Sequence, residues 1–356
     1  MNLSHEISRF RVDLSLTEAG TPPDSWYTQP AFHNLERDAV FQGNWLYAGR
    51  LDQVAASGDY FTGVVMKRPF VVTRSDDDEL HAFFNVCRHH GTCVAKGEGK
   101  TDLLVCPYHG WSYALDGQLK KAPRAGAIQS VVDGHLNLKP ITVDTWGPFV
   151  WICFGTPQRS LSEQLAEMGK LLDLQRFDGL IFIKSICYEI HCNWKVYVDN
   201  YLDGGYHVPH MHPHLASGLD LKSYHSEIGS FWSVQGCSAN SKRRRLGEDA
   251  AYAWMYPNFM INLYGPWMDT NLVIPLDVDR CKVVFDYYFR GIPEKALLEK
   301  ALTDSDQVQK EDMEICDMVQ AGLESGAYDQ GVYAPRFEAP MHHFHKLLRE
   351  DFGAET

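Results

Sequence analysis

Hydrophobic residues follow two different patterns along the chain, and these patterns divide it into two parts. Residues 45–155 hold short apolar runs of β type, separated by turn residues such as Gly58, Asp116 and Gly117. The runs are Phe61–Val65, Phe70–Thr73, Leu80–Val86, Leu103–Cys106 and Thr145–Phe154. This alternation predicts a small all-β domain over residues 45–155.

The pattern changes after residue 155. Residues 160–176 show helical apolar spacing that opens with the capping-box pair Ser160 and Glu163, and residues 194–207 predict a second helix. Strand patterns return over 256–291, and Pro293 opens a long amphipathic helix that reaches about Leu323. We expect an α+β domain with a sheet flanked by helices. Residues 1–44 could pack on either part, and we assign them with 156–356 to this second domain.

Composition and charge narrow the class of protein. The 356 residues carry 46 Asp and Glu against 33 Lys and Arg, a formal net charge of −13. This charge argues against nucleic acid and anionic membrane surfaces as partners. The longest strongly apolar stretch, Phe149–Phe154, is far shorter than the roughly 20 residues of a spanning helix. The N-terminus has no pattern of a signal or transit peptide, so we expect a soluble, cytoplasmic protein.

Cysteine and histidine form a first cluster with metal-binding spacing. Cys87-Arg-His89 and Cys106-Pro-Tyr-His109 are separated by sixteen residues. A structural zinc site is one interpretation, but zinc fingers usually bring cysteines as closely spaced pairs. Two loops that each deliver one thiolate and one imidazole favour a Rieske [2Fe–2S] cluster, which carries single electrons. His90 and Cys93 in the same loop are expected to serve packing or to surround the ligands.

Four histidines between residues 207 and 214 form a second cluster. His207 and His212 have the H-x4-H spacing, whereas His210 and His214 are expected at the surface or beside the ligands. Two histidines and one carboxylate make the facial triad of non-haem Fe(II) oxygenases. The carboxylate must come from elsewhere in the chain. Asp312 on the predicted long helix is the candidate, with Glu311 and Glu314 as competitors.

These motifs resemble those of the Rieske non-haem iron oxygenase alpha subunits. Within that family the chain is most similar to the choline monooxygenases and their bacterial relatives. The similarity is carried by residues 193–212 (NWKVYVDNYLDGGYHVPHMH), 256–276, 281–289 and 340–348. It implies a Rieske domain joined to a helix-grip catalytic domain, assembled head to tail as a homotrimer. It also implies Asp312 as the third ligand of the mononuclear iron.

The resemblance further implies an electron path between subunits. In such trimers a buried acid joins a cluster histidine, here His109, to an iron histidine of the neighbouring subunit, here His207. Most family members place this acid three residues before the iron histidine, where this chain has Gly204. Because positions four apart on a helix share a face, Asp203 is the expected bridging acid.

The implied function is that of a terminal oxygenase component. It would use O2 and electrons that come ultimately from NAD(P)H through a ferredoxin or flavin reductase. We expect it to hydroxylate a small quaternary ammonium compound, choline-like or betaine-like, by C-hydroxylation or N-demethylation. Aromatic faces recognise such cations, and Tyr264 and Trp267 are the chosen candidates in the aromatic segment 252–269. By resemblance, Asn200 is expected near the iron.

Other interpretations stay open at this point. The same iron sites could serve an aromatic or heterocyclic acid, because fold and cofactors are shared across many substrates. A non-enzymatic Rieske electron carrier with incidental histidines is an alternative of another class. The basic run Lys242–Arg245 could dock an acidic ferredoxin or bind a substrate carboxylate, or it could form a solvated loop.

Overall fold

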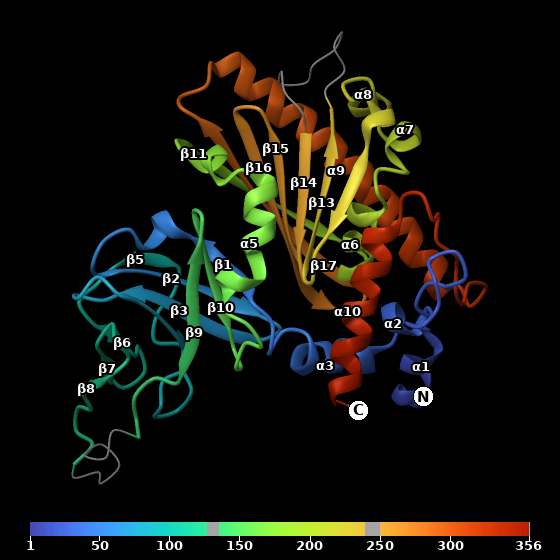
Figure 1. The fold of residues 1–356 in the computed structure, drawn as a ribbon. Coiled ribbons are helices and arrows are strands. Elements are labelled where there is room, and N and C mark those ends of the chain that lie inside the picture. The colour runs from blue at the N-terminus through green and yellow to red at the C-terminus, as the bar shows by residue number, and fades with distance from the viewer. Residues whose placement is uncertain (127–134, 239–249, 356) are drawn as a thin grey trace. The chain divides into compact units, whose positions relative to one another are not determined.

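The chain folds into two compact units in a computed structural model that describes residues 1–126, 135–238 and 250–355 (Figure 1). One unit is Phe41–Glu163, and the other joins Met1–Val40 to Gln164–Thr356. The basic run Lys242–Arg245 lies outside the described residues. Within the described ranges, no helix combines the length and the apolar character that crossing a membrane requires.

The unit Phe41–Glu163 is built from antiparallel strands, as predicted. Its larger sheet has the order β1-β10-β9-β4-β3-β2-β5, and a smaller sheet has the order β6-β7-β8. The strands of the larger sheet are β1 (Leu46–Arg50), β2 (Asp59–Val65), β3 (Arg68–Arg74), β4 (Leu80–Phe84), β5 (Glu98–Lys100), β9 (Pro140–Trp146) and β10 (Phe149–Cys153). The smaller sheet contains β6 (Leu104–Val105), β7 (Ser112–Tyr113) and β8 (Leu119–Lys121). The predicted run Thr145–Phe154 is a hairpin rather than one strand, because the chain turns at Gly147, whose φ is +56°.

The second unit is centred on a seven-stranded antiparallel sheet of order β11-β17-β16-β15-β14-β13-β12. Its strands are β11 (Leu180–Ile190), β12 (His225–Ile228), β13 (Trp232–Cys237), β14 (Ala250–Met255), β15 (Phe259–Tyr264), β16 (Trp267–Asp277) and β17 (Arg280–Arg290). The β16–β17 hairpin turns between Asp277 and Arg280. This sheet and its helices confirm the predicted α+β class.

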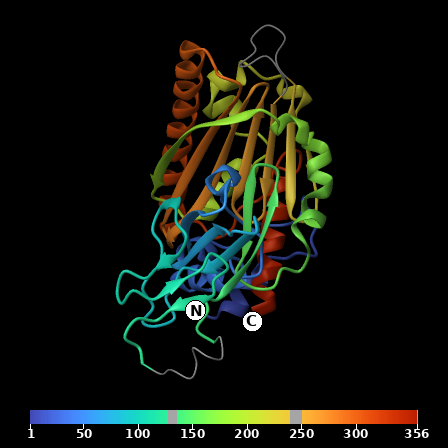
Figure 2. The same ribbon diagram turned by 90° about the vertical axis from the view of Figure 1, so that its left-hand side faces the viewer.

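Helices pack around this sheet. α6 (Trp194–Leu202) contacts β16 and β17 as well as α9 (Lys295–Glu324), so it lies between the sheet and α9 (Figure 1). Figure 2 shows α9, in orange, along one side of the strands. The C-terminal helix α10 (Ala339–Glu355) contacts α6. The other α-helices among the described residues are α1 (Leu3–Arg9), α2 (Ser25–Thr28), α3 (Pro30–Ala39), α5 (Leu161–Leu172), α7 (Val208–Met211) and α8 (Pro213–Ala216).

Local sequence signals explain where two of these helices begin. The predicted capping box is present at α5, because Glu163 N–H donates to Ser160 Oγ and Ser160 N–H donates to Glu163 Oε2. At α6 the Asn193 side chain is the N-cap and accepts a hydrogen bond from Lys195 N–H at 3.0 Å. The predicted helix over 194–207 is too long, because α6 ends at Leu202.

A buried ion pair anchors the start of α6. The Lys195 ammonium contacts the Glu36 carboxylate of α3, and both side chains are fully buried. Trp194 Nε1–H donates to the other oxygen of Glu36 at 2.8 Å. Burial lowers the pKa of Lys195, and the charge of Glu36 opposes that shift. The N-terminal residues are therefore part of the core that holds α6 in place.

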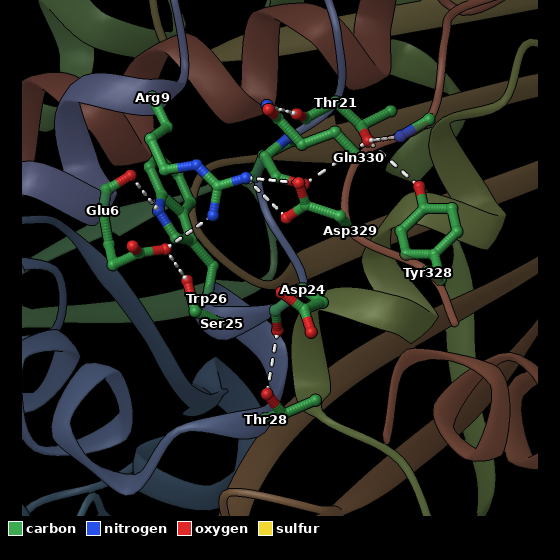
Figure 3. A network of polar contacts seen from close by, with 12 residues as sticks. Glu6, Arg9, Thr21, Asp24, Ser25, Trp26, Thr28, Tyr328, Asp329 and Gln330 are labelled. Atoms are coloured by element: carbon green, nitrogen blue, oxygen red, sulfur yellow. Dashed lines mark hydrogen bonds and ion pairs between the residues drawn. The ribbon is translucent and has the colours of Figure 1, made fainter. Parts of the chain in front are cut away.

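The N-terminal segment is also tied to the residues that follow α9. Figure 3 shows Arg9 between Glu6 and Asp329, and its Nη2 lies 2.5 Å from each oxygen of Asp329. Gln330 Nε2 donates to the Thr21 carbonyl at 2.7 Å. Segments far apart in the sequence, the N-terminal residues and those after α9, thus lie side by side in this unit.

We expect Glu36→Gln to lower the free energy of unfolding by about 3–5 kcal/mol, because it leaves the Lys195 charge buried without its partner. Chemical denaturation monitored by circular dichroism measures this change. The matched control is the double variant Glu36→Leu/Lys195→Met, which removes both charges and should lose much less stability. Equal stability of Glu36→Gln and the unchanged chain would contradict this assignment.

Candidate functional site

Three predicted ligands of a mononuclear metal meet in the second unit. His207 precedes α7, His212 follows it, and Asp312 lies on α9. Their ligand atoms all lie within 4.8 Å of one another. His212 Nε2 is 3.0 Å from Asp312 Oδ1, and His207 Nε2 is 4.0 Å from the same oxygen. The structure therefore brings together the predicted set.

The competing candidates lie elsewhere. Glu314 is exposed on α9, and His210 and His214 are exposed at the surface, as the sequence predicts. Glu311 also lies on α9, but its carboxylate contacts the far side of the His212 ring. The arrangement thus leaves Asp312 as the carboxylate between the two histidines.

Each histidine ring is oriented by a second carboxylate. Asp203 Oδ2 is 2.5 Å from His207 Nδ1, and Glu311 Oε2 is 2.6 Å from His212 Nδ1. Nδ1–H donates in both pairs, which leaves both Nε2 atoms as the free ligand atoms. Two imidazoles and a carboxylate in this geometry fit a non-haem iron, because they are the donors of its facial triad.

Charge also favours a cation at this position. Burial lowers the pKa of His212, but the hydrogen bonds and charges of Asp312 and Glu311 outweigh it and raise that pKa. Burial raises the pKa of Glu311, whereas its bonds to His212 and Gln307 lower it, with a net decrease. A metal ion can replace the proton that this negative surrounding attracts.

Asp203 reaches His207 by a turn and not by a continuous helix. The prediction relied on helical spacing, but α6 ends before Asp203, and Gly204 and Gly205 have φ values of +70° and +71°. A Cβ at Gly204 would come within 2.1 Å of the Phe337 carbonyl oxygen. The position that usually carries the acid therefore has neither the backbone conformation nor the space for one in this chain. Asp203 thus contacts His207 because the chain turns at the two glycines, and not because the two residues share a helix face.

Asn200 lies beside the proposed iron ligand Asp312, in keeping with its predicted position near the iron. Its Nδ2 donates to Asp312 Oδ1 at 2.8 Å from the last turn of α6. This bond fixes the carboxylate that faces both histidines. Asn200 also lines the adjoining cavity.

A cavity of about 110 Å³ opens beside the three ligands. It is of the same order as a cavity of about 150 Å³ that holds benzene, so it suits a small molecule. Its lining is aromatic and amide-rich. The lining includes Tyr197, Tyr201, Tyr252, Tyr264, Asn262, Asp269, Ser305 and Gln309.

The two aromatic candidates for substrate contact have different positions. Tyr264 lines the cavity, and its ring lies edge to face with that of Tyr252 at 5.6 Å. Trp267 is absent from the described lining, because its ring packs on Tyr287 and its Nε1–H donates to Asp269 Oδ2. Trp267 was predicted to contact the substrate, but it does not line the cavity. Its indole N–H instead holds the Asp269 carboxylate, which does.

Asp269 is the buried charge of this cavity. Its side chain lies in the middle of the sheet and accepts hydrogen bonds from Trp267 Nε1–H and from Asn262 Nδ2 at 2.6 Å. Tyr201 OH donates to Asn262 Oδ1 at 2.9 Å, which links α6 to the same network. Two neutral donors, an indole N–H and an amide N–H, thus hold this carboxylate.

The other predicted cluster lies in the unit Phe41–Glu163, on two similar loops. In each loop the cysteine carbonyl accepts a hydrogen bond at 3.0 Å from a glycine four residues later. The cysteine N–H donates at 2.8 Å to the carbonyl of the residue five positions later. The pairs are Cys87 with Gly91 and Thr92, and Cys106 with Gly110 and Trp111.

These loops place thiols inside and imidazoles outside. Cys87 and Cys106 are buried, whereas His89 and His109 are exposed with ring centroids 4.6 Å apart. Tyr113 OH lies 3.3 Å from Cys87 Sγ, and burial raises the pKa of this hydroxyl. Two buried thiolates and two outer imidazoles are the donor set that a Rieske cluster requires.

Glu311, which the sequence offered only as a competing metal ligand, instead contacts the Nδ1 side of the His212 ring. It stands directly before Asp312, and neighbouring helical residues point in different directions, so spacing alone does not place both near one metal. Only the position of His212 on the adjoining segment reveals the contact. The signal available in the sequence was the adjacent acidic pair itself.

We expect Glu311→Ala to weaken retention of the mononuclear metal by about 10–100-fold, because His212 loses the partner that orients its ring. Competition with a metal chelator measures the change. Glu314→Ala on the exposed side of the same helix is the matched control and should retain metal normally. Equal retention by both variants would show that Glu311 does not support the site.

Comparison with known families gives matches to both units. Residues 177–353 match the catalytic domain of the ring hydroxylating alpha subunit family, and residues 44–132 match the Rieske [2Fe–2S] domain family. The chloroplastic choline monooxygenase of Arabidopsis thaliana is 46% identical over 98% of this chain and 87% of its own length. The carnitine monooxygenase oxygenase subunit of Escherichia coli (strain K12) is 29% identical over 94% of each chain.

Solved structures give the same fold. The quaternary ammonium Rieske monooxygenase CntA in complex with its substrate L-carnitine has a TM-score of 0.83 and 25% identity. The similarity covers 96% of this chain and 97% of CntA. Naphthalene 1,2-dioxygenase from Rhodococcus sp. shares the fold with a TM-score of 0.81 at 18% identity, over 99% of this chain and 98% of its own. Together with the sequence identities, these matches establish that the chain belongs to the Rieske non-haem iron oxygenase alpha subunits, and within them is homologous to the choline and carnitine monooxygenases.

Proposed function

We propose that this chain is the oxygenase component that hydroxylates a small quaternary ammonium compound with O2 and electrons from a reductase partner. The observation that carries the proposal is the buried Asp269 and the tyrosines beside it, in a cavity that His207, His212 and Asp312 also line. The activities after which the choline and carnitine monooxygenase relatives are named point in the same direction.

The chemistry of the lining suits a cation without acidic protons. A quaternary ammonium group offers no N–H donor, so its recognition depends on aromatic faces and on negative charge. Tyr201, Tyr252 and Tyr264 supply the aromatic groups, and Asp269 supplies the charge. Burial raises the pKa of Tyr201 well above its ordinary value, so its hydroxyl stays neutral.

The same lining holds two carboxylates, Asp269 and Asp312. Their negative charge disfavours a further carboxylate beside them. We therefore place a choline-like alcohol first and betaine-type cations behind it, in agreement with the 46% identity to a choline monooxygenase.

Different residues bind the two metal centres and the substrate. We assign His207, His212 and Asp312 to the mononuclear iron and Cys87, His89, Cys106 and His109 to the [2Fe–2S] cluster. When bound, the iron is where O2 is activated and the cluster is where single electrons arrive. The tyrosines and Asp269 orient the substrate and exclude water. One oxygen atom enters a substrate C–H bond and the other leaves as water, with electrons from the reductase and protons from solvent completing the balance.

The electron path and assembly belong to the same proposal. We propose a homotrimer in which Asp203 connects His207 to His109 of a neighbouring subunit, with NAD(P)H supplying electrons through a ferredoxin or flavin reductase. The support is the 2.5 Å contact of Asp203 with His207 and the inter-subunit electron transfer named for CntA.

We propose residues 45–155 as the Rieske domain and residues 1–44 with 156–356 as the catalytic domain. A cytoplasmic location remains a prediction, since the plant relatives are named chloroplastic.

Substrate-dependent O2 uptake with a surrogate reductase tests the proposed function. We expect uptake with choline, weaker uptake with glycine betaine and carnitine, and none with simple aromatic acids. Asp269→Asn should raise KM for choline by about tenfold or more, because it removes the charge that faces the cation. Uptake with aromatic acids and none with any quaternary ammonium compound would overturn the proposal.

A further inference from the structure

Gln309 is a buried amide in the wall of the substrate cavity. It lies on α9 three residues before Asp312, and its side chain is 1% exposed. Ser305, Gln309 and Asp312 all line the cavity, as their helical spacing of four and three residues allows. The amide is therefore on the same face of the helix as the proposed metal ligand.

The two ends of this amide have different surroundings. Its Oε1 accepts a hydrogen bond of 2.7 Å from Tyr197 OH on α6. Its Nε2 is buried and has no hydrogen-bond acceptor among the described residues. Burial raises the pKa of Tyr197, so this hydroxyl keeps the proton that it donates to the amide oxygen. The nitrogen is thus the end of this cavity-lining amide whose hydrogen bond is unmade among the described residues.

A buried N–H without an acceptor is unfavourable in a folded protein, so such groups call for an explanation. A second buried glutamine on α9 shows the usual arrangement. Gln320 accepts a hydrogen bond from Asn193 N–H at 2.9 Å and donates to Glu324 Oε1 at 2.7 Å. Gln320 is satisfied at both ends and is not among the residues that line this cavity. Gln309 differs from Gln320 in both respects, because its nitrogen has no acceptor among the described residues and because it lines the cavity.

We propose that Gln309 Nε2 donates a hydrogen bond to the oxygen atom of the bound substrate. The inference rests on the proposed function, in which Asp269 and the tyrosines take the cationic end. Gln309 then recognises the hydroxyl end of a cationic alcohol and holds the carbon that bears this hydroxyl next to the three metal ligands. Gln309 is thereby a specificity-determining residue that separates an alcohol from the matching alkyl cation.

Binding of two matched ligands isolates this hydrogen bond. Choline and ethyltrimethylammonium differ only in the hydroxyl group, and calorimetry on the full chain under anaerobic conditions measures both dissociation constants. The unchanged chain should bind choline more tightly. Gln309→Met should weaken choline binding by about tenfold, or about 1.4 kcal/mol, and leave ethyltrimethylammonium binding unchanged.

Two further variants guard against effects on the fold. Gln320→Met removes the other buried amide of α9 and should leave the ratio of the two dissociation constants at its original value. Tyr197→Phe/Gln309→Met removes both partners of the 2.7 Å bond, so no buried hydroxyl is left without an acceptor. This double variant should also bind the two ligands with nearly equal affinity.

The outcomes separate the two proposals. Equal loss of affinity for both ligands in Gln309→Met, or no loss for either, would overturn the role of Gln309 while leaving the quaternary ammonium site intact. A change of the ratio in Gln320→Met would also overturn it, because the effect would then come from α9 as a whole. Failure of the unchanged chain to bind either cation would overturn the proposed function itself, and this inference with it.

Discussion

The mononuclear site depends on the orientation of two imidazole rings by two carboxylates. Asp203 and Glu311 each take the Nδ1 side of a ring, so that both Nε2 atoms face Asp312. Three separate segments must be held together for this to happen: the end of α6, the short helix α7 and the middle of α9. The buried pair of Lys195 and Glu36 fixes the start of α6 and is therefore part of the same support.

Much of the site follows from the sequence because its residues lie in short motifs. The two Cys–His loops and the pair His207 and His212 have spacings that chemistry requires, so local sequence is sufficient to find them. Asp312 came from the family resemblance, since three acidic residues on one helix offer the same donor atom. The strand and helix classes also follow from hydrophobic periodicity, with helix ends displaced where the chain turns, as after Leu202.

The rest depends on contacts between segments far apart in the chain. Glu311 meets His212 across about a hundred residues, and the role of Trp267 is visible only from the position of Asp269 in the sheet. Gln309 is an ordinary helical residue in the sequence, and only its burial and its unmatched nitrogen single it out. The turn at Gly204 and Gly205 shows how a correct contact, Asp203 with His207, can arise by a route that helical spacing does not predict.

We infer that one chain holds two separate iron centres, one on each of its two units. Iron and acid-labile sulfide analysis of the unchanged chain and of His207→Ala, with electron paramagnetic resonance of the reduced proteins, measures both centres. We predict about three irons and two sulfides per chain, and loss of about one iron in His207→Ala with the Rieske signal retained. Zinc without sulfide, or loss of the Rieske signal in His207→Ala, would rule out two separate iron centres.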